Sequence, residues 1–245
     1  MIRPNWDRLT VWKETQQLYN DFPSRSSTIY HDFSEDECAP LVRRFTTEVS
    51  VVNGDCIDVA IMLKHEGYNP LLLNMACWRR AGGMVEFGSA AQEEECFRRS
   101  NYFKHLHQSY YPPQKFDTFI SKGVEYYCGS IRDGYKLLES PVQIDMIAAP
   151  AVENPAISRN GREFTEAEDI AIMEKKIHQL FWIGAKEGND VLVLSAWGCG
   201  AYGCPPEHVA RIFKKVCEEQ SGLFKKVVFA ILGSNEPIFQ RVFQG

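Results

Sequence analysis

Three consecutive glutamates, Glu93, Glu94 and Glu95, follow Gln92 at the start of a predicted helix, directly after a glycine-rich segment over residues 81–91. A carboxyl group can give a proton to a leaving oxygen and then take one from water, provided that burial or a neighbouring carboxylate raises its pKa. The helix dipole also favours acidic side chains in any first turn. Taken alone, the spacing therefore favours a solvated cluster, and we expect Glu95 to be solvated.

A second glycine-bearing loop follows an apolar segment further along the chain. Residues 191–196 are almost entirely apolar, residues 198–206 hold three closely spaced glycines, and residues 206–220 have helical spacing. Glycines let a phosphate approach backbone N–H groups, and the following helix adds a favourable dipole. The loop lacks the Gly-Lys-Ser/Thr ending of a P-loop, so it fits a phosphate cradle and a plain turn about equally well.

Strands and helices that alternate along the chain must position these two loops. The predicted strands are residues 46–52, 70–76, 124–128, 142–148, 191–196 and 227–232. The predicted helices are residues 6–22, 56–66, 92–100, 165–187, 206–220 and 236–243. Largely apolar strands of this kind predict a sheet that helices cover on both faces. Open α/β sheets bind ligands at the carboxyl ends of their strands, and we expect both loops there.

Local signals refine this outline. Asp55 is a predicted N-cap for the helix at 56–66, and Thr165 with Glu168 is a predicted capping box for the helix that follows. Residues 24–36 are polar with little periodicity and are predicted to be a loop, and residues 101–123 are predicted to be loop and short pieces, with His105 and His107 at the surface. One domain over residues 46–245, with residues 1–45 as a helical extension packed on it, is the simplest organisation.

The charge and the apolar content of the chain indicate which classes of binding partner to expect. The net charge is −5, and Lys and Arg are scattered in short clusters, such as Arg98-Arg99, that we interpret mostly as solvated surface. Duplex nucleic acid is therefore not an expected partner. The N-terminus lacks the apolar segment of a signal peptide, and no apolar run approaches the roughly 20 residues that span a bilayer. We expect a cytoplasmic monomer, or a nuclear one in a eukaryote, that does not bind membranes and keeps its cysteines reduced.

A zinc site is not expected. Cys199, Cys204 and His208 have spacing that resembles part of one, but no fourth ligand with matching spacing follows. Structural zinc is almost always held by four ligands.

Together, the two loops resemble those of the microbial-type poly(ADP-ribose) glycohydrolases, a branch of the macrodomain superfamily. That family has an Asn at a strand end, a Pro-Gly-Gly-Gly turn, a short spacer and Gln-Glu-Glu. The matching residues here are Asn74, Ala81-Gly82-Gly83-Met84 and Gln92-Glu93-Glu94, without a gap. Residues 196–203, followed by Pro205-Pro206, resemble the diphosphate loop of the family. The resemblance covers most of residues 45–243.

This resemblance implies a macrodomain-like mixed sheet flanked by helices on both faces. It also implies an enzyme that binds ADP-ribose and hydrolyses the glycosidic bond of poly(ADP-ribose) or of ADP-ribosylated proteins, without cofactor or metal. Glu94 would be the acid/base, Glu93 would hold the distal ribose, and Gln92 would orient the loop. The other implied ligand-binding residues are Asn74, Gly82, Gly83, Gly198, Cys199, Gly200, Ala201, Tyr202, Gly203, Asn235 and Phe239. For Phe239, packing in the core fits the sequence equally well.

Three positions depart from the family pattern. Met84 stands at the third glycine of the turn, Ala81 at the proline, and Cys77 at an Asn three residues after Asn74. A side chain at Met84 could crowd the ligand, and the loss of the Asn could remove a hydrogen bond to ribose. Two alternatives therefore remain open: an ADP-ribose reader with weakened turnover, and a hydrolase restricted to mono-ADP-ribosylated side chains.

Overall fold

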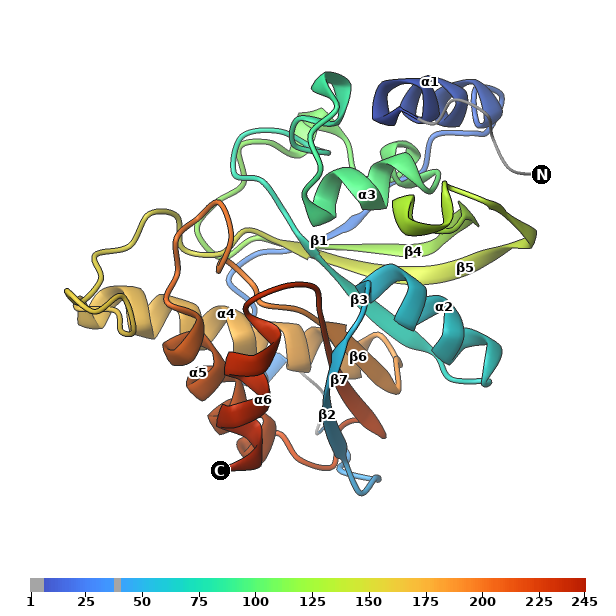
Figure 1. Ribbon diagram of the computed structural model, residues 1–245. Helices are drawn as coiled ribbons and strands as arrows, with labels where there is room; N and C mark the ends of the chain where they lie inside the picture. Colours follow the sequence, from blue (N-terminus) through green and yellow to red (C-terminus); the bar gives the residue numbers. More distant parts are fainter. Residues whose placement is uncertain (1–6, 38–40) are drawn as a thin grey trace. The chain divides into compact units, whose positions relative to one another are not determined.

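The structure is a computed structural model of the 245-residue chain, and it describes residues 7–37 and 41–245. The chain divides into two compact units, which are coloured along the sequence in Figure 1. The first unit contains the described residues up to His31 together with Asn74–Ala149. The second unit contains the described residues of Asp32–Leu73 together with Pro150–Gly245.

An antiparallel sheet forms the frame of the first unit. Its strands, in spatial order, are β1 (Thr28–Tyr30), β4 (Thr118–Cys128) and β5 (Leu137–Ala149). Its helical elements are α1 (Arg8–Leu18), η2 (Val85–Phe87), α3 (Gln92–Arg98), η3 (Tyr102–Lys104), η4 (Gln108–Tyr110) and η5 (Ile131–Asp133). The β4–β5 register shifts between Ser121 and Val124, where Gly123 has a φ of +61°. A glycine in this left-handed conformation is typical of a bulge.

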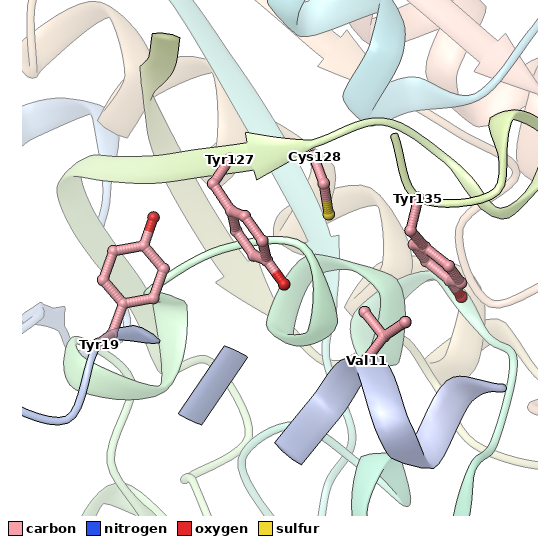
Figure 2. Packing of buried hydrophobic residues seen from close by; sticks show 5 residues of the cluster. All are labelled: Val11, Tyr19, Tyr127, Cys128 and Tyr135. Atoms are coloured by element: carbon pink, nitrogen blue, oxygen red, sulfur yellow. The ribbon is translucent and has the colours of Figure 1, made fainter. Parts of the chain in front are cut away.

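Helix α1 is anchored in the core of this unit. The side chains of Val11, Tyr19, Tyr127, Cys128 and Tyr135 form one buried cluster, and Figure 2 shows Val11 pointing from α1 toward it. Asp7 caps the helix by accepting the N–H groups of residues 9 and 10, each at 3.0 Å. In Figure 1, α1 lies beside α3, the helix that carries the three glutamates.

Four parallel strands form the frame of the second unit. In spatial order they are β3 (Pro70–Met75, of which the last two residues belong to the first unit), β6 (Val191–Leu194), β7 (Lys226–Ile231) and β2 (Glu48–Asn53). The helices of the unit are α2 (Cys56–His65), α4 (Ala167–Lys186), α5 (Pro206–Glu219), α6 (Glu236–Gln244) and the short η1 (Glu35–Glu37). Helix α2 lies on one side of these strands and α4 to α6 on the other (Figure 1), as buried parallel strands require.

Most predicted elements are present, and one predicted cap is wrong. Asp55 accepts the N–H groups of Ile57 and Asp58 at 3.0 Å and caps α2, as expected. Helix α4 has Glu166 at its N-cap position without a side-chain hydrogen bond, so the capping box of Thr165 and Glu168 does not form. The Thr165 hydroxyl contacts the Glu166 carboxylate at 3.4 Å instead.

The two predicted loops contain strands that the local pattern did not reveal. Strand β1 lies within residues 24–36, and β4 begins at residue 118 rather than 124. Polar side chains that are buried in pairs hide the period here: the hydroxyl oxygens of Ser27 and Ser121 are 2.7 Å apart in the interior. Trp6, the first residue of the predicted helix at 6–22, lies outside the described residues.

None of the helices in the described ranges is both long and apolar enough to cross a bilayer. The proposed division of the chain at residue 45 stays a prediction, since the compact units divide it at other places.

Candidate active site

Gln92 fixes where the glutamate-bearing helix begins. Its side-chain oxygen accepts the N–H of Met75 at 2.9 Å, and its amide nitrogen lies 3.4 Å from the sulfur of Cys96. The N-cap of α3, Ala91, offers no side-chain oxygen of its own. The Gln92 amide therefore ties the start of α3 to the end of β3, and its role in orienting the loop stays a prediction.

Glu93 is buried against the backbone of the glycine turn. Its carboxylate accepts the N–H of Cys77 at 2.8 Å, the N–H of Gly82 at 3.1 Å and the side-chain amide of Asn74 at 3.3 Å. Burial raises the pKa of Glu93 to about 8, and the neighbouring carboxylate of Glu94 adds to this rise. The three donors oppose it, because they favour the ionised form.

Glu94 contacts the glycine turn through one of its two carboxyl oxygens. Its side chain is buried, and Oε1 accepts the N–H of Met84 at 2.9 Å. The second carboxylate oxygen, Oε2, is also buried and has no hydrogen-bond partner among the residues that the structure describes. A buried carboxyl oxygen that nothing else occupies can carry a proton and present it to a substrate oxygen.

Two glycines of the turn are required by close contacts. Gly83 has a φ of +55°, and a Cβ atom there would lie 2.4 Å from Oε1 of Glu94. Gly82 has a φ of +77°, and a Cβ atom there would lie 2.7 Å from the ring of Phe97. Both the backbone conformation and the available space therefore exclude a side chain at these two positions.

The departures from the family pattern fit this turn without strain. Met84 has a φ of −111°, which any residue adopts, and its side chain is 43% exposed. The contact of Cys77 with Glu93 uses the backbone N–H, and the Cys77 sulfur accepts the N–H of Arg79 at 3.3 Å. Met84 and Cys77 therefore preserve the backbone hydrogen bonds to the carboxyl groups of Glu94 and Glu93.

Glu95 is not solvated, contrary to our expectation. It is buried and forms an ion pair with Arg98, and it accepts the hydroxyl of Tyr135 at 2.8 Å. Arg98 and Arg99 are fully buried, so that pair of arginines is not surface either. The spacing of three residues between Glu95 and Arg98 on one helix was a signal for this pair, whereas the contribution of Tyr135 was not visible in the sequence.

His105 is likewise buried rather than exposed. Burial, and then the positive charge of Arg25, lower its pKa to about 4. The imidazole is therefore neutral at ordinary pH. His107, which we also expected at the surface, is partly exposed and contacts the backbone carbonyl of Arg25.

The second glycine-bearing loop lies in the second unit, between β6 and α5. Gly198 has a φ of +76°, and a Cβ atom there would lie 2.7 Å from the sulfur of Cys204. The N–H of Cys204 returns to the Gly198 carbonyl at 3.0 Å, and the N–H of Gly203 to the Gly200 carbonyl at 3.0 Å. These bonds fold the loop into consecutive tight turns.

Three N–H groups of this loop remain unused. Within residues 7–37 and 41–245, no hydrogen bond is formed by the N–H groups of Gly198, Gly200 and Ala201. Gly200 and Ala201 are exposed, and no atom lies within 4 Å of a Cβ atom built on Gly200. Several free N–H groups ahead of a helix N-terminus are the usual features of an anion site.

The remaining predicted ligand residues differ in their placement. Tyr202 is partly exposed, and its carbonyl accepts the N–H of Asn154 at 2.8 Å. Asn235 donates to the Cys199 carbonyl at 3.5 Å, which places it beside the loop. Phe239 is fully buried and its ring lies 5.8 Å from that of Phe229. Phe239 is thus packed in the core, as the alternative interpretation expected, and its contact with the ligand stays a prediction.

Two groups of side chains in the described ranges have residue types that can bind metals, and both have other contacts. His208 accepts the N–H of Phe164 at 3.1 Å, and burial raises the pKa of the Cys204 thiol to about 12. Across the described residues, the group with metal-binding spacing consists of Glu174, His178 and Glu219. Lys215 already forms ion pairs with both of these glutamates.

Gly83→Ala tests the contact between the turn and Glu94. The added methyl group must displace the carboxylate, and we expect turnover of an ADP-ribosyl substrate to fall by about tenfold or more, because reacting groups tolerate little misplacement. Gly67→Ala is the matched control: its φ is +88°, but nothing lies within 4 Å of its Cβ position. Equal activity losses in the two variants, measured at matched folded fractions, would contradict the contact.

Glu93→Gln tests the raised pKa of Glu93. The folded chain holds this proton up to about pH 8, whereas the unfolded chain loses it near pH 4.5. The stabilisation from the bound proton is complete below pH 4.5 and is lost as the pH rises through 8, by up to about 1.4 kcal/mol per pH unit. Urea unfolding between pH 5 and 8 should show this decline in the native chain and not in the variant. Parallel curves for the two proteins would refute the shift.

A protein-family model matches the part of the chain that contains the glycine turn and α3. The model described as "Microbial-type PARG, catalytic domain" matches residues 10–127, which include the glycine turn and Gln92-Glu93-Glu94. No curated protein sequence matches the chain.

Solved structures show the same fold over nearly the whole chain. A poly(ADP-ribose) glycohydrolase from Thermomonospora curvata matches with a TM-score of 0.82 and 21% identity, covering 96% of this chain and 99% of that one. Its complex with the inhibitor ADP-HPD matches with a TM-score of 0.79, 22% identity and coverage of 96% and 98%. The enzyme from Deinococcus radiodurans in complex with ADP-ribose matches with a TM-score of 0.77, 23% identity and coverage of 95% and 97%.

These neighbours confirm the expected macrodomain-like mixed α/β fold. The family model adds that residues 10–127 match the catalytic domain of the microbial-type poly(ADP-ribose) glycohydrolases (PARG).

Proposed function

We propose that the protein binds ADP-ribose and hydrolyses the glycosidic bond that links it to poly(ADP-ribose) or to a protein side chain. The observation that carries the proposal is the state of Glu94: a buried carboxyl group with one oxygen on the Met84 N–H and the other unoccupied. Glu95 also has a buried oxygen without a partner among the described residues, but its other oxygen pairs with Arg98 and Tyr135, whereas that of Glu94 contacts the glycine turn. The family match over residues 10–127 and the ADP-ribose complex of the Deinococcus radiodurans enzyme support the same ligand.

Glu94 acts in two steps. It first donates its proton to the leaving oxygen as the bond from that oxygen to the anomeric carbon of the distal ribose breaks. The resulting carboxylate then takes a proton from a water molecule, whose oxygen forms the new bond to the anomeric carbon. The proton count closes, because Glu94 ends each cycle protonated and the products are free ADP-ribose and the released hydroxyl or side-chain group.

Glu93 holds the distal ribose. Its two oxygens have about four hydrogen-bonding sites, of which three accept backbone and amide donors. The fourth, on Oε2, carries the proton below about pH 8 and can donate it in a hydrogen bond to a ribose hydroxyl. Asn74, Gly82 and Gly83 shape this part of the site through their contacts with the two carboxyl groups.

The loop of the second unit binds the diphosphate. The unused N–H groups of Gly198, Gly200 and Ala201 supply the donors, and the dipole of α5 adds a favourable field. Gly203 and Cys199 keep the turns tight, and Tyr202 contacts the ligand beside this loop. Asn235, which already contacts the Cys199 carbonyl, faces the adenosine end.

The remaining expectations stay predictions. They are a monomeric, cytoplasmic enzyme whose substrates are ADP-ribosylated proteins, and the absence of duplex nucleic acid as a partner.

Glu94→Gln tests the assigned acid/base. The amide preserves shape and burial but cannot deliver a proton, so release of ADP-ribose should fall by about 10²- to 10⁴-fold. Binding of free ADP-ribose, measured by calorimetry, should change little. Glu86→Gln, at an exposed glutamate in the same turn, is the matched control and should keep full activity. If the Glu94→Gln protein still released ADP-ribose at the native rate, Glu94 would not be the acid.

Met84 favours a second candidate, a hydrolase that acts on single ADP-ribosyl groups attached to protein. Its N–H contacts the carboxyl that protonates the leaving group, so its 43%-exposed side chain begins beside the leaving-group position. A second ADP-ribose unit must pass this side chain, whereas an extended protein side chain is narrower.

Met84→Gly tests this preference. The φ of −111° suits glycine, so the turn should keep its shape. Relief of the steric block should raise kcat/KM on poly(ADP-ribose) by roughly tenfold relative to kcat/KM on a mono-ADP-ribosylated peptide. Release of ADP-ribose from both substrates is followed side by side. An unchanged ratio would remove Met84 as the source of specificity.

A further inference from the structure

Arg98 connects three separate segments of the first unit. Its guanidinium group is fully buried and pairs with the carboxylate of Glu95 on the same helix. It also donates to the carbonyl of Ser89 at 2.6 Å, at the end of the glycine turn, and to the carbonyl of Arg8 at 3.2 Å, in the first turn of α1. A buried guanidinium uses its fixed fork of donors to hold several acceptors in one geometry.

Thr15 joins the middle of α1 to the end of α3. Its buried hydroxyl has two carbonyl acceptors, that of Arg98 at 2.5 Å and, further away, that of Val11 in its own helix at 2.8 Å, and it accepts from the hydroxyl of Tyr127, 2.7 Å away. The Arg98 carbonyl lies in the last turn of α3, where carbonyl groups lack partners within the helix. Thr15 therefore caps α3 from a segment 83 residues away.

Aromatic packing continues this connection to the turn itself. The ring of Trp12 lies 6.4 Å from that of Phe97 and 5.4 Å from that of Phe103. The ring of Phe97 also contacts Gly82. The two are so close that a Cβ atom on Gly82 would lie 2.7 Å from the ring. Any shift of Phe97 therefore reaches Gly82, whose N–H holds Glu93.

We propose that helix α1 is a positioning element of the active site: through Thr15, Phe97 and Arg98 it sets the glycine turn and thereby the two carboxyl groups. The inference rests on the proposed function of Glu93 and Glu94. It gives α1 a role in catalysis in addition to packing, because Phe97 and Arg98, which contact α1, also contact the glycine turn. None of the α1 residues touches the reacting atoms, so they are positioning rather than catalytic residues.

The experiment compares Thr15→Val with Thr15→Ser in the full chain. Valine keeps the shape of threonine and removes the hydroxyl, whereas serine keeps the hydroxyl. Gln16→Ala, an exposed position on the same helix, controls for changes in helix propensity. Each variant is assayed well below its unfolding temperature for kcat and for the Kd of free ADP-ribose, and the amide hydrogen exchange of Gly82 and Met84 is measured without ligand. These two N–H groups hold Glu93 and Glu94, so their exchange reports the grip directly.

In the Thr15→Val protein we expect kcat to fall by roughly tenfold, the Kd for ADP-ribose to change by less than about threefold, and both amides to exchange faster. The Thr15→Ser and Gln16→Ala proteins should behave like the native chain. A lower unfolding temperature with unchanged kcat and unchanged exchange at Gly82 and Met84 would overturn the proposal and leave α1 a purely stabilising element.

The two proposals fail in different ways. If the native chain released no ADP-ribose from any substrate, the proposed function would fall, but exchange at Gly82 and Met84 would still decide whether α1 positions the turn. If the native chain is active and Thr15→Val matches it in both readouts, only the positioning role is lost.

Discussion

The structure of the site depends on one constraint: two adjacent carboxyl groups are buried against the backbone of a single glycine turn. Glu93 and Glu94 accept hydrogen bonds from the N–H groups of Cys77, Gly82 and Met84. The conformation of the turn and the position of α3 therefore depend on each other. Burying carboxyl groups is unfavourable unless such donors compensate it. The same burial raises the pKa of Glu93 and leaves Oε2 of Glu94 without a partner among the described residues. The conformation that binds the carboxyl groups is therefore also the one that makes them chemically useful.

This constraint explains which substitutions the chain tolerates. Gly82 and Gly83 have positive φ and no space for a side chain, whereas the next position has ordinary φ and an exposed side chain. Methionine can therefore replace glycine at position 84 without disturbing the grip, and its effect is confined to what approaches Glu94 from outside. A turn of this kind can change substrate preference at one position while keeping its chemistry at the others.

Local sequence signals predicted the parts of the fold that depend on local physics. The continuous apolar strand at Val191–Leu194 and the Asp55 cap are examples. Strand β1 depends on pairing with β4, nearly ninety residues away, and no local period marks it. For the site, the Gln-Glu-Glu motif and both glycine loops were visible, but the burial of Glu95 and Arg98 was not. That burial comes from Tyr135 and from backbone carbonyls in other segments, which spacing along one helix cannot reveal.

The most direct test of the central claim is a crystal structure of the Glu94→Gln protein with ADP-ribose bound. The account predicts that the anomeric carbon of the distal ribose lies within roughly 3–4 Å of the side chain at position 94, with a ribose hydroxyl on Glu93. A nucleotide whose distal ribose lies away from the glycine turn would contradict it.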